Sequence, residues 1–128
     1  MVDIKEQSPL SLAFVGDAVY SLLIREHLVT SKRYTISKLN SITVQYVSAK
    51  GQFAAMEIIS PMLTEQEAAV YKRGQNSSKA SVAKHASARE YRASTGFECL
   101  VGYLHLTGQD DRINQLVGEI IEKMPVNL

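Results

Sequence analysis

Apolar residues recur at intervals of three and four along most of this chain, which is the spacing of amphipathic α-helices. Residues 8–29 predict one long helix, because Ser8 is an N-cap residue and Pro9 suits the first helical position. Two series at intervals of four mark its apolar positions: Leu10, Phe14, Ala18 and Leu22, and Val15, Val19 and Leu23. This wide apolar face should be buried on more than one side. Gly16, a costly residue in a helix interior, points to close packing or function.

Two further helices are predicted in the middle of the chain. The first spans residues 37–59 and ends before Pro61, which cannot continue a helix. The second spans residues 64–73, because Thr64 with a glutamate three residues later forms a capping box. We expect Gly74 to follow the end of this second helix.

A polar, small and basic segment, RGQNSSKASVAKHAS at residues 73–87, is interpreted as a functional loop. Ser87, with a glutamate three residues later, forms another capping box and opens a helix that ends at Gly108. Asp110 begins a last helix that runs to Lys123, because acidic residues stabilise a helix N-terminus. No strand alternation is present, so the sequence predicts an all-α fold.

The composition is that of an ordinary globular protein. The chain has 128 residues, of which 45% are hydrophobic and 21% are charged, and we expect one domain over residues 1–128. No apolar run approaches the length of a membrane span, and the N-terminus lacks the layout of a signal peptide. We therefore expect a cytoplasmic protein that makes no membrane contact.

Common enzyme motifs are absent from the sequence, including the P-loop, the dinucleotide fingerprint and the HExxH zinc motif. Cys99, the only cysteine, lies among apolar residues and is expected to be a buried, inert thiol. His27 and His105 lie in apolar helical stretches and are expected to be core or helix-end residues. His85 lies in the basic loop and is the better candidate for a phosphate contact.

The basic residues are concentrated in one segment, although the net charge of the chain is only +1. Between Lys72 and Arg92 there are six basic residues and one acidic residue, Glu90. Such a segment is either a solvated face or a surface for a polyanion such as nucleic acid. Charge alone leaves both interpretations open.

Two acidic residues stand in apolar surroundings. Asp17 is the only charged residue between Gln7 and Arg25, and Glu98 lies inside TGFECLVGYLHL. Taken singly, each carboxylate either pairs with a buried group or belongs to a functional site, since burial of an unpaired charge is costly. Two such acids favour a shared site, where a cation would offset their repulsion. Oxygen ligands alone indicate Mg²⁺, with Mn²⁺ as a substitute.

These two segments resemble the ribonuclease III catalytic domain. LAFVGDAVYSLLI is similar to the signature helix of that family, which carries a metal-binding aspartate, and TGFECLVGYLHLTG to its second acidic helix, which carries a metal-binding glutamate. The resemblance assigns these catalytic and metal-binding roles to Asp17 and Glu98 and covers residues 9–122. The basic loop followed by YRASTGFE is most similar to the small bacterial branch, Mini-ribonuclease III, which lacks a separate double-stranded RNA-binding domain.

The chain departs from the wider family at several acidic positions. Ala13, Thr95 and, by a looser alignment, Ala49 stand where the family has further acids. The reduced set fits the Mini branch, and we expect one well-held metal ion. In the basic loop, Gln75 and Lys79 depart from the R-G-R-N-A-K-S pattern of that branch.

The resemblance implies a Mg²⁺-dependent endoribonuclease that cuts double-stranded RNA and leaves 5′-phosphate and 3′-hydroxyl ends. It implies a two-fold homodimer with the helix around Gly16 at the interface, which would explain the wide apolar face. The substrate implied by the family is precursor 23S ribosomal RNA. The candidate RNA-binding residues are Lys72, Arg73, Asn76, Lys79, Lys84 and His85.

Two alternatives follow from the same residues. The absence of acids at Ala13 and Thr95 is compatible with a catalytically inactive ribonuclease III-like domain that binds RNA in an assembly role. The wide apolar face is compatible with an all-α protein-interaction module that binds neither metal nor RNA.

Overall fold

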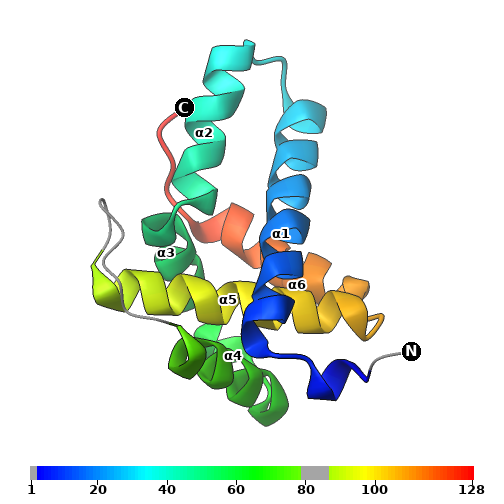
Figure 1. Cartoon of the computed structure of the whole chain (residues 1–128). Helices are drawn as coiled ribbons and strands as arrows, with labels where there is room; N and C mark the ends of the chain where they lie inside the picture. The colour runs from blue at the N-terminus through cyan, green and yellow to red at the C-terminus, as the bar shows by residue number, and fades with distance from the viewer. Residues whose placement is uncertain (1–2, 79–86) are drawn as a thin grey trace.

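The structure is a computed structural model that describes residues 3–78 and 87–128. The described residues form six α-helices and two 3-10 helices and contain no strand, so the all-α prediction is confirmed. The elements are η1 (Ile4–Glu6), α1 (Pro9–Ser31), α2 (Ile36–Val47), α3 (Ala49–Ile59), η2 (Ser60–Met62), α4 (Glu65–Ser77), α5 (Ala88–Leu106) and α6 (Asp110–Lys123). Figure 1 shows their arrangement in space.

Helix α5 is the central element of the fold. It runs through the middle of the molecule, with α1 crossing it and α3 and α4 packed along it (Figure 1). Apolar side chains on nearly every face of its second half are buried, among them Phe97, Leu100 and Leu104. Tyr20 of α1 meets Phe97 edge to face, with ring centroids 4.7 Å apart. The core therefore forms around α5.

The backbones of α1 and α5 touch where the two helices cross. A Cβ atom on Gly16 would overlap the carbonyl oxygen of Glu98, and a Cβ atom on Gly102 would overlap the carbonyl oxygen of Leu12. Only glycine allows an approach this close, because any side chain would push the helices apart. This contact explains the glycine in the middle of α1.

The N-cap at Ser8 and the predicted long helix are confirmed by α1. Its apolar residues divide into two faces. One face is buried against α5 and its neighbours and includes Leu12, Tyr20, Ile24 and Leu28. The other remains exposed and carries Leu10, Phe14, Leu22 and Val29, a set that we call the α1 stripe. The apolar face is as wide as predicted, but this chain buries only one side of it, so the expected burial of a second side is not seen in a single copy.

The prediction of one helix over residues 37–59 is wrong, because the chain breaks at Ser48 into α2 and α3. Ser48 is extended, with φ −63° and ψ 161°, and its Oγ accepts a hydrogen bond of 3.1 Å from the Gly51 N–H. The serine therefore caps α3 and ends α2. Gly51 allows the turn to be tight, since a Cβ atom there would overlap the Gln45 carbonyl oxygen.

The predicted end of the next helix is also wrong, because α4 continues past Gly74 to Ser77. Gly74 is buried inside the helix, where a Cβ atom would lie 2.7 Å from Cys99 Cβ in α5. The glycine serves close helix packing here instead of ending the helix. The predicted loop at residues 73–87 is therefore helical as far as Ser77, and residues 79–86 lie outside the described part of the chain.

The other helix ends lie within two residues of the predicted positions, with α1 continuing to Ser31 and α2 starting at Ile36. Both capping boxes are present, at Thr64 and at Ser87, and Gly108 ends the α5 turn with a positive φ of 75°. Helix α6 spans the predicted residues from Asp110 to Lys123. Over residues 3–78 and 87–128, no helix is long and apolar enough to cross a membrane.

One buried ion pair joins α6 to α4. Arg112 donates from Nε to Glu67 Oε2 at 2.9 Å and from Nη2 to Glu67 Oε1 at 2.9 Å. Its Nη2 also donates to the Met62 carbonyl oxygen at 2.8 Å. The guanidinium hydrogen bond holds the pKa of Glu67 below its ordinary value, although burial acts in the opposite direction.

Candidate functional site

Asp17 and Glu98, which are 81 positions apart in the sequence, lie together in the fold. The close approach of α1 and α5 at Gly16 places the following residue, Asp17, beside Glu98. Asp17 is exposed and Glu98 is partly buried. The pair therefore has one carboxyl group open to solvent and one set into the protein.

The surroundings of Glu98 disfavour its charged form. The pKa of Glu98 is raised to about 8, first by burial and then by the neighbouring Asp17 carboxyl group, which acts as a hydrogen-bond partner and as a like charge. A hydrogen bond from Gln52 lowers this pKa and partly offsets the two effects. Neither carboxyl group forms an ion pair with a basic side chain among residues 3–78 and 87–128, so a cation would supply the compensating charge when both are ionised.

Gln52 is a site residue that the sequence analysis did not identify. Its side chain is 1% exposed, and Nε2 donates to Glu98 Oε2 at 3.3 Å and to the Val47 carbonyl oxygen at 3.1 Å. The available signal was a glutamine among the apolar residues of the predicted 37–59 helix. Its partner could not be deduced, because Glu98 belongs to a different helix.

The donor set fits a hard divalent cation better than zinc. The pair offers carboxylate oxygens only, and no group of three or more histidine, cysteine, aspartate or glutamate side chains suited to a metal occurs in the described residues. Mg²⁺ is commonly held by one or two carboxylates, with its other positions filled by water and substrate phosphate. Asp17, on the exposed side of the pair, leaves room for such ligands.

Of the three positions that lack acids relative to the resemblance, Ala49 is partly buried at the start of α3 and the other two are filled by buried residues. Ala13 is 7% exposed and Thr95 is 6% exposed. Thr95 Oγ1 donates to the Tyr91 carbonyl oxygen at 3.1 Å and to Ser78 Oγ at 3.3 Å, which ties α5 to the end of α4. These positions therefore serve packing in this chain and add no carboxylate to the pair.

The candidate RNA-binding residues are described only in part. Lys72, Arg73 and Asn76 are exposed on the last turns of α4. The other three candidates, Lys79, Lys84 and His85, lie outside the described residues. Lys72 and Arg73 give α4 a positively charged end just before that segment.

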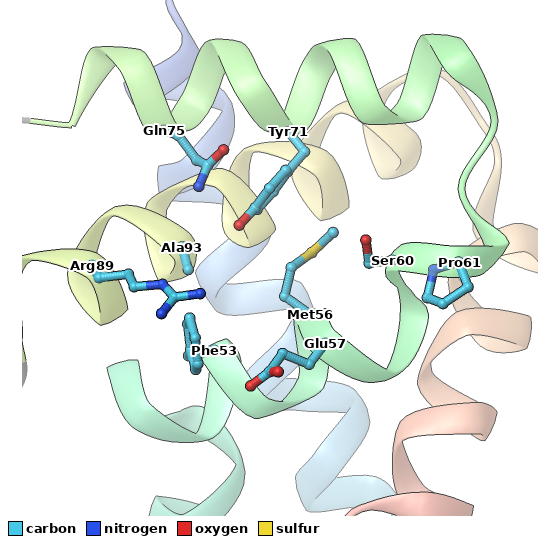
Figure 2. A pocket seen from close by; sticks show the side chains of 9 residues that line it. All are labelled: Phe53, Met56, Glu57, Ser60, Pro61, Tyr71, Gln75, Arg89 and Ala93. Atoms are coloured by element: carbon cyan, nitrogen blue, oxygen red, sulfur yellow. The ribbon is translucent and has the colours of Figure 1, made fainter.

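A cavity of about 380 Å³ lies between α3, α4 and α5, away from the acid pair. Figure 2 shows Tyr71 and Gln75 pointing into it from α4, with Phe53 on the α3 side and Arg89 on the α5 side. The Arg89 guanidinium lies over the Phe53 ring, 5.1 Å from its centroid. Neither Asp17 nor Glu98 lines this cavity, so it is separate from the candidate metal site.

The expectations for cysteine and histidine agree with the structure. Cys99 is 1% exposed, and burial raises the pKa of its thiol to about 11, so it is not an activated nucleophile. His105 lies at the end of α5, with Nδ1 2.8 Å from Asp110 Oδ1. His27 is partly buried in α1.

Comparison with known proteins places these features in a family context. Residues 10–109 match the Ribonuclease III domain family model. The chain is 43% identical over 126 residues to Mini-ribonuclease 3 of Enterococcus faecalis, covering 97% of this chain and 96% of that protein. It is 42% identical over 126 residues to Mini-ribonuclease 3 of Streptococcus pneumoniae, covering 97% and 98%.

The fold has a close match among solved structures. An X-ray crystal structure of a Fusobacterium nucleatum protein superposes with a TM-score of 0.85 at 29% identity, covering 95% of this chain and 98% of that chain. The similarity therefore extends over nearly all of the helical arrangement that brings Asp17 and Glu98 together.

Proposed function

We propose that this chain, which belongs to the Mini-ribonuclease 3 branch of the ribonuclease III domain family and is an endoribonuclease, cleaves double-stranded RNA with a divalent cation held by Asp17 and Glu98. One observation supports this proposal above the others: two carboxyl groups from distant helices lie in contact, and neither has an ion pair with a basic side chain in the described part of the chain. The presence of both acids favours cleavage over the alternatives of an inactive RNA-binding domain and an interaction module.

Asp17 and Glu98 would bind the cation from opposite sides. When bound, Mg²⁺ supplies activation of water near neutral pH and neutralises charge that develops on the phosphate. Glu98 would hold the ion from the protein side, fixed by its hydrogen bond from Gln52. Asp17 would hold it from the exposed side, where an RNA phosphate can approach. In-line attack of water on phosphorus breaks the bond to the 3′ oxygen and leaves 5′-phosphate and 3′-hydroxyl ends.

A second copy of the chain is proposed to cover the α1 stripe. Phe14 is 83% exposed and Leu22 is 57% exposed, which is unusual for large apolar side chains in a free surface. Both belong to the helix that carries Asp17, so a two-fold dimer through this helix would bring two acid pairs into one assembly. Two pairs would cut the two strands of one duplex.

The RNA itself is proposed to be a stem of precursor 23S ribosomal RNA, which is the substrate implied by the family. Contacts from Lys72, Arg73 and Asn76, together with Lys79, Lys84 and His85, would run to the backbone phosphates and 2′-hydroxyls. Such contacts recognise the shape of an A-form duplex and carry little sequence information. Substrate choice would then depend on the position of the stem in the precursor.

The test is cleavage of a precursor 23S stem by the purified protein, with Mg²⁺ and with excess EDTA. We expect cuts on both strands that leave 5′-phosphate ends, only when Mg²⁺ is present. A matched single-stranded RNA is the control and should stay intact. Cleavage that persists in EDTA, or an intact stem in Mg²⁺ with folded protein, would refute the proposal.

A further inference from the structure

Gln52 differs from the other buried polar residues in where its hydrogen bonds lead. The described core contains five buried polar residues: Thr43, Gln52, Glu67, Ser94 and Thr95. Thr43 and Ser94 donate to carbonyl oxygens of their own helices, and Glu67 pairs with Arg112. Gln52 alone among the five donates to a member of the acid pair.

The break at Ser48 makes this geometry available. In a continuous helix the Val47 carbonyl oxygen would accept a hydrogen bond from the Gly51 N–H. Here the Gly51 N–H donates to Ser48 Oγ, and the Val47 carbonyl oxygen accepts from Gln52 Nε2 at 3.1 Å instead. The carbonyl group at the end of α2 therefore fixes the amide of Gln52 in the first turn of α3.

The chemistry of its two partners determines which way the amide faces. The Val47 carbonyl oxygen can only accept a hydrogen bond, so the amide nitrogen must face it, and the same nitrogen donates to Glu98 Oε2. The amide oxygen, Oε1, is buried and has no hydrogen-bond partner among the described residues. A buried acceptor in this condition destabilises the fold, a cost that an apolar side chain of the same size would avoid.

We propose that Gln52 is a positioning residue, which holds Glu98 Oε2 so that the carboxyl group is preformed beside Asp17 for a divalent cation. The inference rests on the proposed function, since it takes the acid pair to be the metal site. A free glutamate side chain must lose rotamer freedom when it binds a metal, and a fixed hydrogen bond removes part of that loss beforehand. Partners of this kind orient metal ligands in proteins generally.

The test measures metal affinity without RNA, so it does not depend on turnover. Mn²⁺ is the probe, and its free concentration is followed by electron paramagnetic resonance during titration of the purified protein. Gln52→Met keeps the length of the side chain and removes the donor. We expect it to bind Mn²⁺ about 10–100-fold more weakly than the unmodified chain. Thr43→Val is the matched control, because it removes a buried polar group from the neighbouring helix α2. It should bind Mn²⁺ as the unmodified chain does.

The same titration with Asp17→Asn separates the two hypotheses. If Asp17→Asn binds Mn²⁺ weakly but Gln52→Met binds it within twofold of the unmodified chain, the role of Gln52 is overturned and the metal site stands. Unchanged binding by Asp17→Asn would overturn the metal site and the role of Gln52 with it. Circular dichroism checks the fold of each variant. If Gln52→Met does not fold, Gln52→Asn, whose shorter amide does not span the distance to Glu98, provides the same comparison.

Discussion

Gly16 in α1 and Glu98 in α5 are in direct main-chain contact, so that a Cβ atom on Gly16 would overlap the Glu98 carbonyl oxygen. We predict that Gly16→Ala pushes the two helices apart and lowers the free energy of unfolding by about 1–3 kcal/mol. Cleavage should fall as well, because the two acids move apart. Urea denaturation and a cleavage assay measure the two effects.

Gly118→Ala is the matched control for this change. Gly118 is also inside a helix, but nothing lies within 4 Å of a Cβ atom placed there. Alanine should leave stability unchanged or raise it by about 0.5–1 kcal/mol, because it is the better helix former. Equal effects of the two substitutions would mean that the contact at Gly16 does not determine the spacing of the acids.

Asp17→Asn should abolish cleavage while the protein remains folded. The substitution removes one carboxylate of the proposed metal site, and a loss of at least 10³-fold in rate is expected for a ligand of the catalytic ion. In metal-free buffer the variant should melt at the same or a higher temperature, because a like-charge neighbour of Glu98 is gone. Thermal denaturation and cleavage are measured on the same sample, and full activity of Asp17→Asn would remove it from the site.

Phe14→Glu should convert the proposed dimer into a monomer. The charge would lie in the middle of the α1 stripe, where Phe14 is 83% exposed in a single copy, so the fold should tolerate it. Light scattering should give about 14.2 kDa for the variant, against about twice that mass for the unmodified chain. Val44→Glu places the same charge at an exposed valine of α2 and should leave the mass unchanged. A monomeric unmodified chain would contradict the dimer.

Replacing Lys72, Lys79 and Lys84 together by alanine should weaken binding to duplex RNA. Each lost phosphate contact should lower the salt dependence of the binding constant by about one unit in a double-logarithmic plot. Filter binding at several salt concentrations measures this slope. Lys38→Ala, at an exposed position of α2, is the control. An unchanged slope in the triple variant would mean that the basic segment is a solvated face that does not contact RNA phosphates.

The Glu67–Arg112 pair should stabilise the protein in a pH-dependent way. The pKa of Glu67 is lowered in the folded protein by its hydrogen bond to Arg112. This stabilisation is therefore complete above the ordinary glutamate value near 4.5 and is lost as the pH falls through the lower folded value. Arg112→Leu should cost about 1.5–3 kcal/mol at pH 7, and the difference should shrink below pH 4.5.

Denaturation at pH 7 and at pH 3 measures this difference. Lys123→Ala, which removes the exposed pair with Glu119, is the control and should have no measurable effect at either pH. A constant difference between Arg112→Leu and the unmodified chain at both pH values would assign the effect to packing instead of charge.

The helix ends that depend on local chemistry could be predicted from the sequence. Ser8 with Pro9 and the capping boxes at Thr64 and Ser87 act within a few residues, so their geometry follows from the residue types. The juxtaposition of the acids was predicted less directly, from the absence of other charges around each one. The distance between their helices could not be predicted, because it depends on which helices cross.

Two of the three features that were missed depend on contacts between distant segments, and the third, the break at Ser48, is hidden by the apolar spacing. Ser48 interrupts a stretch whose apolar spacing continues on both sides, so periodicity alone favours one helix. Gly74 has the residue type of a helix end, but its surroundings in α5 make it a packing position. Gln52 has no local signal for its role, since its partner comes from another helix.

The touching main chains at the crossing of α1 and α5 have an evolutionary consequence. Main-chain atoms, and not side chains, determine the distance between the two helices. Substitutions elsewhere in the hydrophobic core can therefore alter stability without changing the distance between Asp17 and Glu98. At this crossing, a single methyl group on either glycine would push the helices apart, so Gly16 and Gly102 should be as intolerant of substitution as the acids that they bring together.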